Sequence, residues 1–227
     1  MTIYQRSNIS GQLSKGQKTK QQILNAAIDV LAHQGIKGAT HRSIAKHANL
    51  QLSLTTYYFK DIRQLINEAF LMSSNRTIAR AKTTWLKVFA LCDSLGKTKL
   101  KKLVIRKELA LTLTDLAADY LMEKVTNHGN DLMVEQMLYT EMQSTEALRS
   151  LAYNHRQALI TPFIKLCSYF NTDTAQIDGD ILLTVFTQLE YRNLTVPVEN
   201  IDRDYIYQTL HRLIHWILKV KKPAVDE

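Results

Sequence analysis

The sequence predicts an all-α protein in which a small basic N-terminal domain is joined through a long helix to a larger helical domain. Apolar residues recur three and four positions apart almost throughout the chain, which is the spacing of one helix face. Glycine and proline, which interrupt helices, number only 7 and 3 among 227 residues. Positive charge gathers at one end: residues 1–63 carry nine Lys and Arg against two Asp, whereas the other 164 residues carry 20 basic and 19 acidic side chains.

These patterns divide the chain into four regions. Residues 1–16 form a polar, basic arm that we expect to be flexible, and residues 17–63 form a compact three-helix domain. Residues 64–221 form the larger helical domain, and residues 222–227 are a short tail. A net charge of +7 beside a body of +1 favours a polyanion-binding module joined to a neutral body. A solubilising face is the alternative interpretation of this charge.

The basic domain is predicted to contain three short helices. The first spans about 18–34 and stops at Gly35, a residue type common just after a helix end. The second spans about 41–48 and begins after Thr40, whose hydroxyl suits an N-cap. Asn49 then supplies a turn, because asparagine adopts the left-handed conformation at modest cost.

The segment LSLTTYYFKD at 52–61 is rich in β-branched and aromatic residues, which favour strand by propensity. No second β-patterned segment lies nearby, and an isolated strand would leave its backbone groups without hydrogen bonds. A short helix is therefore predicted, with Leu50 and Leu54 facing the first two helices and Phe59 at the junction to the next. Together with the preceding helix it has the lengths of a helix-turn-helix, whose second helix enters the major groove of DNA.

The larger domain is predicted to be entirely helical. Gly96 interrupts the first long pattern, Pro162 is expected to kink a later helix, and a loop containing Pro197 separates the last two. The expected helices span about 61–90, 97–113, 115–127, 129–143, 145–170, 175–192 and 203–221.

Several classes of protein are excluded by composition and motif. No window approaches 18 apolar residues, so no membrane span is predicted, and the polar N-terminus lacks a signal region. Cys92 and Cys167 sit in apolar patterns and indicate reduced core thiols of a cytoplasmic protein. Scattered histidines predict no metal and no cofactor. The sequence GKTK at 96–99 lacks the first glycine and the strand of a phosphate loop, and no catalytic set stands out, so no enzyme is predicted.

Three stretches carry a family pattern: ILNAAIDVLAHQG at 23–35, THRSIAKHA at 40–48 and TTYYF at 55–59. With Leu65 they give a combined spacing that resembles the TetR (tetracycline-repressor) family of bacterial transcription regulators, over about residues 18–70. The resemblance implies a DNA-binding helix-turn-helix domain. It also implies a helical C-terminal domain that binds a small ligand and pairs with a second subunit.

Twelve residues are predicted to contact double-stranded operator DNA, from the resemblance and from side-chain chemistry. They are Lys18, Thr40, His41, Arg42, Gln51, Leu52, Ser53, Thr55, Thr56, Tyr57, Tyr58 and Lys60. Base edges are expected to be read by Gln51, Leu52, Ser53 and Thr55, since a glutamine amide can bond adenine bidentately and an apolar group can touch the thymine methyl.

The remaining members of this set are expected to position the protein on the phosphate backbone. By resemblance, Tyr57 and Tyr58 donate their hydroxyls to phosphates. Ile62 stands where lysine is common in the family, so Lys60 or Arg63 is expected to replace that contact. Capping alone is the alternative for Thr40, and simple solvation is the alternative for the exposed lysines and arginines.

Two amphipathic helices at the end of the chain are predicted to form a homodimer interface, as a four-helix arrangement with a second subunit. Burial within the monomer is the alternative. The predicted interface residues are Leu182, Val185, Phe186, Leu189, Ile206, Leu210, Leu213, Ile214 and Ile217.

A pocket for an unknown small-molecule effector is predicted in the larger domain, lined by adaptable methionines and by aromatic rings. Ordinary core packing is the alternative. The predicted lining is Trp85, Phe89, Tyr120, Met133, Glu135, Met137, Tyr139 and Phe163, with Glu135 as a polar anchor. The basic face at 97–107 could favour an anionic ligand, or could simply be solvated.

We therefore expect a DNA-binding transcriptional regulator, specifically a dimeric repressor that a small-molecule effector releases from its operator. The alternative is a helical ligand-binding or scaffold protein whose basic N-terminal unit docks an acidic protein partner. Competition by generic duplex DNA separates the two.

Overall fold

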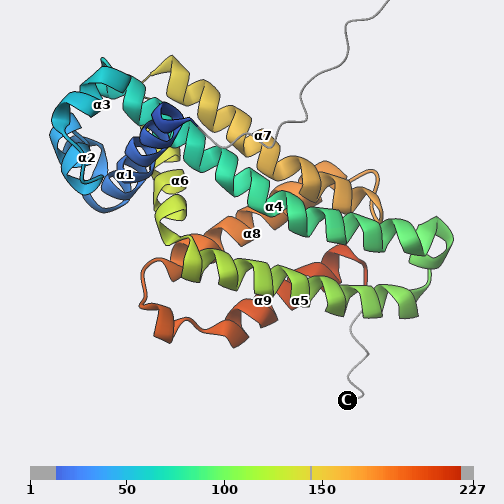
Figure 1. Cartoon of the computed structure of the whole chain (residues 1–227). Helices are drawn as coiled ribbons and strands as arrows, with labels where there is room; N and C mark the ends of the chain where they lie inside the picture. Colours follow the sequence, from blue (N-terminus) through green and yellow to red (C-terminus); the bar gives the residue numbers. More distant parts are fainter. Residues whose placement is uncertain (1–13, 144, 221–227) are drawn as a thin grey trace, which may run out of the picture. The chain divides into compact units, whose positions relative to one another are not determined.

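The computed structural model describes residues 14–143 and 145–220, and all of the regular structure in these ranges is helical (Figure 1). The helices are α1 (Lys15–Gly38), α2 (His41–His47), α3 (Leu52–Tyr58), α4 (Ile62–Leu100), α5 (Leu103–Asn127), α6 (Gly129–Glu141), α7 (Glu146–Ser168), α8 (Ala175–Asn193), the 3-10 helix η1 (Val198–Asn200) and α9 (Arg203–Ile217). The expected all-α class is confirmed. The predicted tail and all but the last three residues of the predicted arm lie outside the described residues.

The chain divides into two compact units between Ala69 and Phe70. The N-terminal unit contains α1, α2, α3 and the start of α4. The C-terminal unit contains the rest of α4 and all later helices. Each unit is described by itself.

In the N-terminal unit, α1 begins three residues earlier than predicted. Ser14 caps it reciprocally with Gln17: the backbone N–H of Gln17 donates to Ser14 Oγ at 3.2 Å, and the N–H of Ser14 donates to Gln17 Oε1 at 2.8 Å. Gly35 interrupts the helix with φ of 69°, as the predicted stop requires. The apolar stripe, including Ile23 and Leu31, is buried.

The turn between α2 and α3 has the predicted chemistry. Asn49 has φ of 52°, in the left-handed region. The side-chain amide of Gln22 donates to the carbonyl of Ala48 at 2.8 Å, which ties α1 to the end of α2. Phe59 is fully buried after α3, so it fills the junction before α4 as expected. The segment 52–58 is a helix, and its strand-like composition yields to packing.

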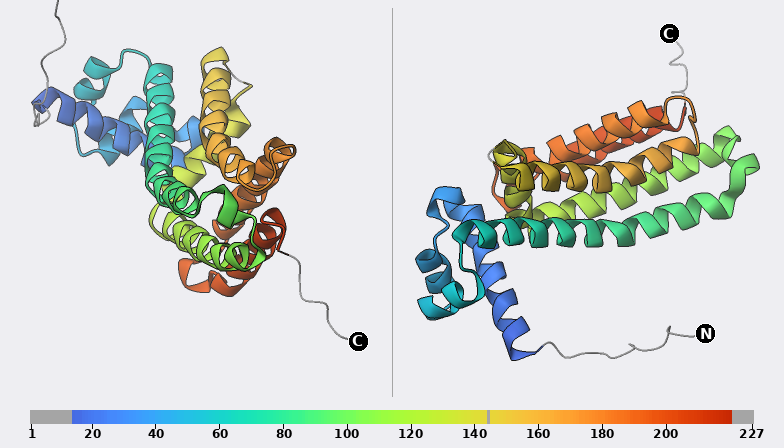
Figure 2. Two further views of the ribbon diagram at one scale, coloured as in Figure 1. Left: turned by 90° about the vertical axis from the view of Figure 1, so that its right-hand side faces the viewer. Right: turned by 90° about the horizontal axis from the view of Figure 1, so that it is seen from above.

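In the C-terminal unit, α5, α7, α8 and α9 lie alongside one another in both views of Figure 2. Gly96, with φ of 67°, interrupts α4 near its end, as predicted. α7 contains Pro162. Cys92 and Cys167 are free and buried, and burial raises the pKa of their thiols to about 11 and about 12.

One helix boundary was predicted wrongly. Residues 97–113 and 115–127 were expected to be separate helices, but α5 runs unbroken from Leu103 to Asn127. Thr114, which lies between the two predicted helices, is fully buried, and its hydroxyl donates back to the carbonyl of Ala110 at 2.7 Å within the helix. On the predicted basic face, Arg106 donates to the carbonyl of Leu218 at 3.2 Å.

Candidate functional site

The predicted DNA contacts lie on a short stretch of the N-terminal unit, and most of them are exposed. The exposed members are Lys18, Thr40, Arg42, Gln51, Leu52, Ser53, Thr56, Tyr57 and Lys60, while His41 and Tyr58 are half-buried. Gln51 precedes α3 and makes no capping hydrogen bond with its side chain. Its amide is therefore free to meet a base edge.

Thr55 is the exception, and the prediction that it reads a base edge is corrected. Its side chain is fully buried. Its hydroxyl donates to the carbonyl of Leu52 at 2.8 Å and faces the carbonyl of His41 at 3.5 Å. Because α3 turns this position toward α2, Thr55 holds the two helices of the motif together. The exposed side chains of Gln51, Leu52 and Ser53 remain as base-edge candidates.

The two tyrosines have different surroundings. Tyr57 is 76% exposed. Tyr58 is half-buried, and a methyl group added at Gly16 would lie 3.2 Å from its hydroxyl oxygen. Their rings meet edge-on, with centroids 5.1 Å apart. Tyr58 thus lies beside the first turn of α1 and contacts the ring of the exposed Tyr57.

Thr40 caps α2, as predicted. Its hydroxyl oxygen accepts from the backbone N–H of Ser43 at 3.1 Å, and its hydroxyl faces Ser43 Oγ at 3.0 Å. The Ser43 hydroxyl in turn lies 2.7 Å from the carbonyl of Gly38. The Thr40 hydroxyl is thus committed to the cap, which leaves the neighbouring Arg42 as the exposed charge of this turn.

Several basic side chains of the N-terminal unit are without an acidic partner. Lys20 pairs with Glu68 at 2.7 Å, and Arg63 lies 3.7 Å from Asp61. Among the described residues, no ion pair involves Lys18, Arg42 or Lys60. Their charges are therefore available to phosphate groups.

The C-terminal unit contains an apolar cavity of about 90 Å³. Aromatic rings follow one another along its wall. Trp85 and Phe163 have centroids 4.7 Å apart, Phe163 and Phe186 5.9 Å, and Phe186 and Tyr120 6.1 Å. Burial raises the pKa of Tyr120 to about 12. Trp85, Tyr120 and Phe163 of the predicted pocket therefore do line a cavity.

The other five residues predicted for the pocket do not line this cavity. They are Phe89, Met133, Glu135, Met137 and Tyr139. Phe89 stacks on Trp85 with a centroid distance of 5.5 Å. The other four lie on α6, which contributes no residue to the cavity wall. The methionines that cluster in the sequence therefore lie on and around α6, and none of them lines the cavity.

Two charged residues do line the cavity, and both are nearly inaccessible to solvent. The ammonium of Lys124 on α5 donates to both oxygens of Glu190 on α8, each at 2.8 Å. Burial by itself lowers the pKa of Lys124, but Glu135 and Glu190 more than offset this effect and the pKa is raised. Burial raises the pKa of Glu190 to about 7, against the opposing influence of Lys124.

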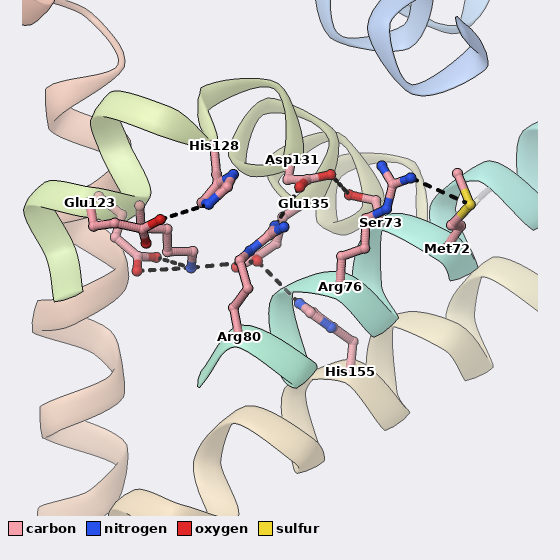
Figure 3. A network of polar contacts seen from close by, with 11 residues as sticks. Met72, Ser73, Arg76, Arg80, Glu123, His128, Asp131, Glu135 and His155 are labelled. Atoms are coloured by element: carbon pink, nitrogen blue, oxygen red, sulfur yellow. Dashed lines mark hydrogen bonds and ion pairs between the residues drawn. The ribbon is translucent and has the colours of Figure 1, made fainter. Parts of the chain in front are cut away.

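Glu135 links this pair to a second layer of polar groups (Figure 3). It lies 3.8 Å from Lys124 Nζ and 3.3 Å from His155 Nε2, and the Tyr191 hydroxyl faces it at 3.4 Å. Burial raises the pKa of Glu135, Lys124 and His155 lower it, and the net shift is downward. On the other side of the ring, His155 Nδ1 lies 2.7 Å from Ser74 Oγ on α4.

A further contact joins α4 to α6. Figure 3 shows Asp131 between Ser73 and Arg80. The Ser73 hydroxyl donates to one carboxylate oxygen of Asp131 at 2.9 Å, and Arg80 pairs with the other. α4 is therefore fixed by buried polar contacts at Ser73, Ser74 and Arg80, shortly after the boundary at Ala69. These contacts hold α4 in a defined position against α6 and α7.

Two comparisons with known proteins bear on this arrangement. Residues 23–69 match the profile of the bacterial regulatory proteins of the tetR family. The N-terminal unit is thus a DNA-binding domain of the tetR family. The chain is a DNA-binding transcriptional regulator, as the sequence predicted. No curated protein sequence matches the chain.

Solved structures similar to this tetR-family regulator cover nearly the whole chain. A tetR-family protein from Streptomyces coelicolor A3 is 23% identical, with a TM-score of 0.56 over 86% of this chain and 98% of that one. A Saccharomonospora viridis protein described as a transcriptional regulator, in complex with choline, is 16% identical, with a TM-score of 0.62 over 87% and 96%. The multidrug binding protein EbrR with ethidium is 23% identical, with a TM-score of 0.52 over 86% and 98%. At these identities the likeness establishes the fold.

The tetR-family regulator differs from the sequence prediction at its closing helices. Most of the residues assigned to a dimer interface are buried within the single chain, where they form the core of the C-terminal unit. These are Leu182, Phe186, Leu189, Ile206, Leu210, Ile214 and Ile217. Their side chains are not free to meet a second subunit, so that part of the prediction is wrong. Val185 and Leu213 are half-buried and line a surface groove.

Lys124 and Glu190 were missed by sequence reasoning, although a signal existed. Glu190 lies four residues after Phe186 and eight after Leu182, so it continues an apolar stripe. Lys124 follows Leu121 by three residues in the same manner. A charged residue on an otherwise apolar helix face is buried only when it is paired, and pairing across helices cannot be read from one helix.

No helix of the described residues has the length and apolarity needed to cross a membrane.

Proposed function

We propose that this tetR-family regulator is a homodimeric repressor, that its C-terminal cavity binds a small-molecule effector, and that effector binding releases it from operator DNA. The observation that carries the proposal is the presence of both parts in one chain. The N-terminal unit presents an exposed polar helix, and the C-terminal unit encloses an apolar cavity with a buried ion pair.

The DNA-reading part rests on α3 and the turn before it. Gln51, Leu52 and Ser53 are exposed at its first turn, and helix-turn-helix proteins place this part of the recognition helix against base edges. Tyr57, Lys60 and Arg42 flank these residues with hydrogen-bond donors suited to phosphate. This arrangement supports sequence-specific contacts by the first turn of α3, with the flanking side chains holding the domain on the phosphate backbone.

The effector part rests on the cavity. It is apolar and aromatic, with a small number of polar groups, which is the usual composition of a small-molecule site. Two proteins of similar fold were solved with bound organic molecules, one with choline and one with ethidium. These structures support a ligand-binding use of the fold in this chain.

The coupling part rests on α4. This helix begins in the N-terminal unit and carries Ser73, Ser74 and Arg80, which are held by Asp131 and His155. His155 contacts Glu135, and Glu135 lies near Lys124 at the cavity wall. A ligand that displaces Lys124 or Glu190 would therefore disturb the groups that hold α4. Two arrangements of α4 with different affinities for DNA would then account for release.

The homodimer part rests on the outer face of the closing helices. Val185 and Leu213 line a surface groove together with three exposed apolar residues, Leu111, Tyr205 and Trp216. Exposed apolar residues gathered in one groove are typical of an interaction surface. A second copy would bring two recognition helices to half-sites about 34–36 Å apart, or a multiple of this spacing.

The test is fluorescence anisotropy with a labelled duplex from upstream of the protein's own gene, beside a scrambled duplex of the same composition. We expect tight binding to the first duplex at a stoichiometry of two chains per site. The variant Tyr57→Phe should weaken it several-fold, whereas Tyr153→Phe, which alters a tyrosine 64% exposed in the C-terminal unit, should leave it unchanged. Equal affinity for the two duplexes would remove the operator-reading role.

A further inference from the structure

We propose that the effector is a compact organic cation: a quaternary or protonated amine with an apolar group, whose positive charge is received by Glu190 and whose apolar part packs against the aromatic wall. This inference rests on the proposed function, because it names the ligand class of the proposed effector cavity. Three features carry it: the charge balance of the buried polar groups, the continuous row of rings, and the size of the cavity.

The first feature is the charge balance. At the cavity wall, the ammonium of Lys124 faces two carboxylates, Glu190 at 2.8 Å and Glu135 at 3.8 Å. Each of these three side chains is at most 4% exposed. With both carboxylates ionised, the single ammonium of Lys124 leaves one of the two negative charges at the cavity wall unbalanced. Uncompensated charge is costly away from water, so a bound cation would be stabilised and a bound anion opposed.

His155 contacts Glu135 at 3.3 Å through Nε2 and Ser74 Oγ at 2.7 Å through Nδ1, and it does not itself line the cavity. Arg80 is already paired with Asp131. Among the described residues, Glu190 is influenced directly by Lys124 from α5 and Glu135 from α6. Tyr120 from α5, His155 from α7, Tyr191 from α8 and the paired Arg80 from α4 lie around these two groups. From α9, the apolar Leu210 and Ile214 line the same cavity.

The second feature is the row of four rings that leads along the cavity, Trp85, Phe163, Phe186 and Tyr120. Aromatic faces attract cations, most strongly when water is excluded. Lys124, Glu190 and these rings all line the same cavity. A cation beside Glu190 would thus meet a carboxylate and aromatic faces at once, as quaternary ammonium sites do.

The third feature is size. The cavity holds about 90 Å³, whereas pockets that enclose drug-sized ligands hold about 300–1,000 Å³. The space as it stands suits a methylated ammonium head group, and a multi-ring ligand would have to widen it. Binding leaves the total charge of the site unchanged: where Glu190 is protonated, its proton is released to solvent when the cation binds.

The experiment is isothermal titration calorimetry of the full-length protein without DNA, using three probes of similar size. These are benzyltrimethylammonium, the neutral benzyl dimethyl carbinol and the anionic phenylacetate. At about pH 8 we expect the cation to bind at least about tenfold more tightly than the other two. Equal or tighter binding of the carbinol or of phenylacetate would overturn the proposal.

A pair of variants assigns the effect to Glu190. Glu190→Gln keeps the shape of the side chain and should reduce the cation's affinity by about tenfold or more, while carbinol binding stays unchanged. The matched control is Asp180→Asn, which removes one negative charge from the same helix, where Asp180 pairs with the exposed Arg156. Asp180→Asn should leave both affinities unchanged. Cation binding that survives Glu190→Gln in folded protein would overturn the assignment.

A measurement on the unaltered protein keeps the proposal testable if the variant fails to fold. Because the pKa of Glu190 is raised to about 7, cation affinity should rise by about tenfold between pH 6 and pH 8. Carbinol affinity should stay flat over the same range, and at about pH 6.5 the cation's binding enthalpy should depend on buffer ionisation. A cation affinity that does not change with pH would count against Glu190 as the receiving group.

Anisotropy with the operator duplex separates this inference from the proposed function. If a neutral or anionic compound releases DNA while the cation does not bind, the ligand class is wrong and the effector mechanism stands. If the cation binds with the expected pH dependence but DNA affinity does not change, the cation site is confirmed and the effector mechanism fails.

Discussion

The two units of this protein place their polar chemistry in opposite locations. Eleven polar or charged residues are buried among the described residues, and ten of them belong to the C-terminal unit. The N-terminal unit buries only Thr55 and presents its remaining polar groups to solvent, where a DNA backbone can reach them. The C-terminal unit instead buries Lys124, Glu135, Glu190 and their partners around a cavity.

The difference matches the partners proposed for the two units. DNA is a large, highly charged partner. Exposed side chains of a small domain can contact it directly, and they stay hydrated until they do. A small ligand gains most from an enclosed site, where a few buried polar groups set specificity and a low dielectric strengthens their interactions. The same contrast predicts where a substitution will act: on DNA affinity when it alters an exposed side chain of the first unit, and on stability when it removes a buried polar group.

The largest expected effect is the loss of Lys124. Lys124→Met should lower the free energy of unfolding of the C-terminal unit by about 3–5 kcal/mol, because two buried carboxylates lose their cation. Urea unfolding followed by tryptophan fluorescence reports on this unit alone, since Trp85 and Trp216, the chain's two tryptophans, both belong to it.

The loss should depend on pH. Lys124 holds down the pKa of Glu190, so Glu190 takes up a proton more easily in the variant, and the destabilisation should be smaller at pH 6 than at pH 8. The control Lys107→Met alters an exposed lysine of the same helix and should cost under about 0.5 kcal/mol. Equal losses in the two variants would show that the buried pair contributes little.

The next effect tests the exposed helix of the N-terminal unit. Gln51→Ala should weaken operator binding by about 1–3 kcal/mol and relax discrimination at one base pair, because the amide would no longer meet a base edge. Anisotropy against a set of single-base operator variants measures this directly. Gln21→Ala, at an exposed position of α1, is the control. A uniform loss across all sequences would reassign Gln51 to the backbone.

Thr55 is a buried polar residue of the otherwise DNA-facing helix α3, so it tests whether such a residue acts on stability or on DNA affinity. Thr55→Val keeps the shape but removes the buried hydroxyl that donates to the carbonyl of Leu52, so we expect a loss of about 1–2 kcal/mol in the stability of the N-terminal unit. Native-state hydrogen exchange of α2 and α3 measures it. DNA affinity of the folded protein should not change. The exposed neighbour gives the control Thr56→Val, and a loss of affinity in Thr55→Val without a loss of stability would restore Thr55 as a reader.

The smallest effect concerns Lys60. Lys60→Gln should reduce the slope of log affinity against log salt by about 1, with equal changes on operator and scrambled DNA, because one phosphate contact is lost. A salt series from low to physiological concentration measures the slope. Lys82→Gln removes an exposed charge from the C-terminal unit and should leave the slope as it is.

Sequence reasoning recovered the N-terminal unit in detail because its signals are local. The cap at Thr40, the left-handed Asn49 and the stop at Gly35 each depend on residues within one turn of the chain. The same reasoning misplaced a boundary inside α5, where Thr114 is buried and its hydroxyl bonds back to Ala110 within a continuous helix. It also assigned to the pocket four residues of α6, where methionines are dense, although α6 contributes no residue to the cavity wall.

The sequence by itself determined the helical class, the helix-turn-helix and its family, because helix periodicity, caps and a short motif are properties of neighbouring residues. Only the tertiary structure decided which apolar stripes are core and which are surface, turning seven expected dimer contacts inward. It also decided that Lys124 meets Glu190, 66 residues further along the chain. Burial and pairing depend on which helices face each other, and an amphipathic stripe looks the same whether its partner is the same chain or another.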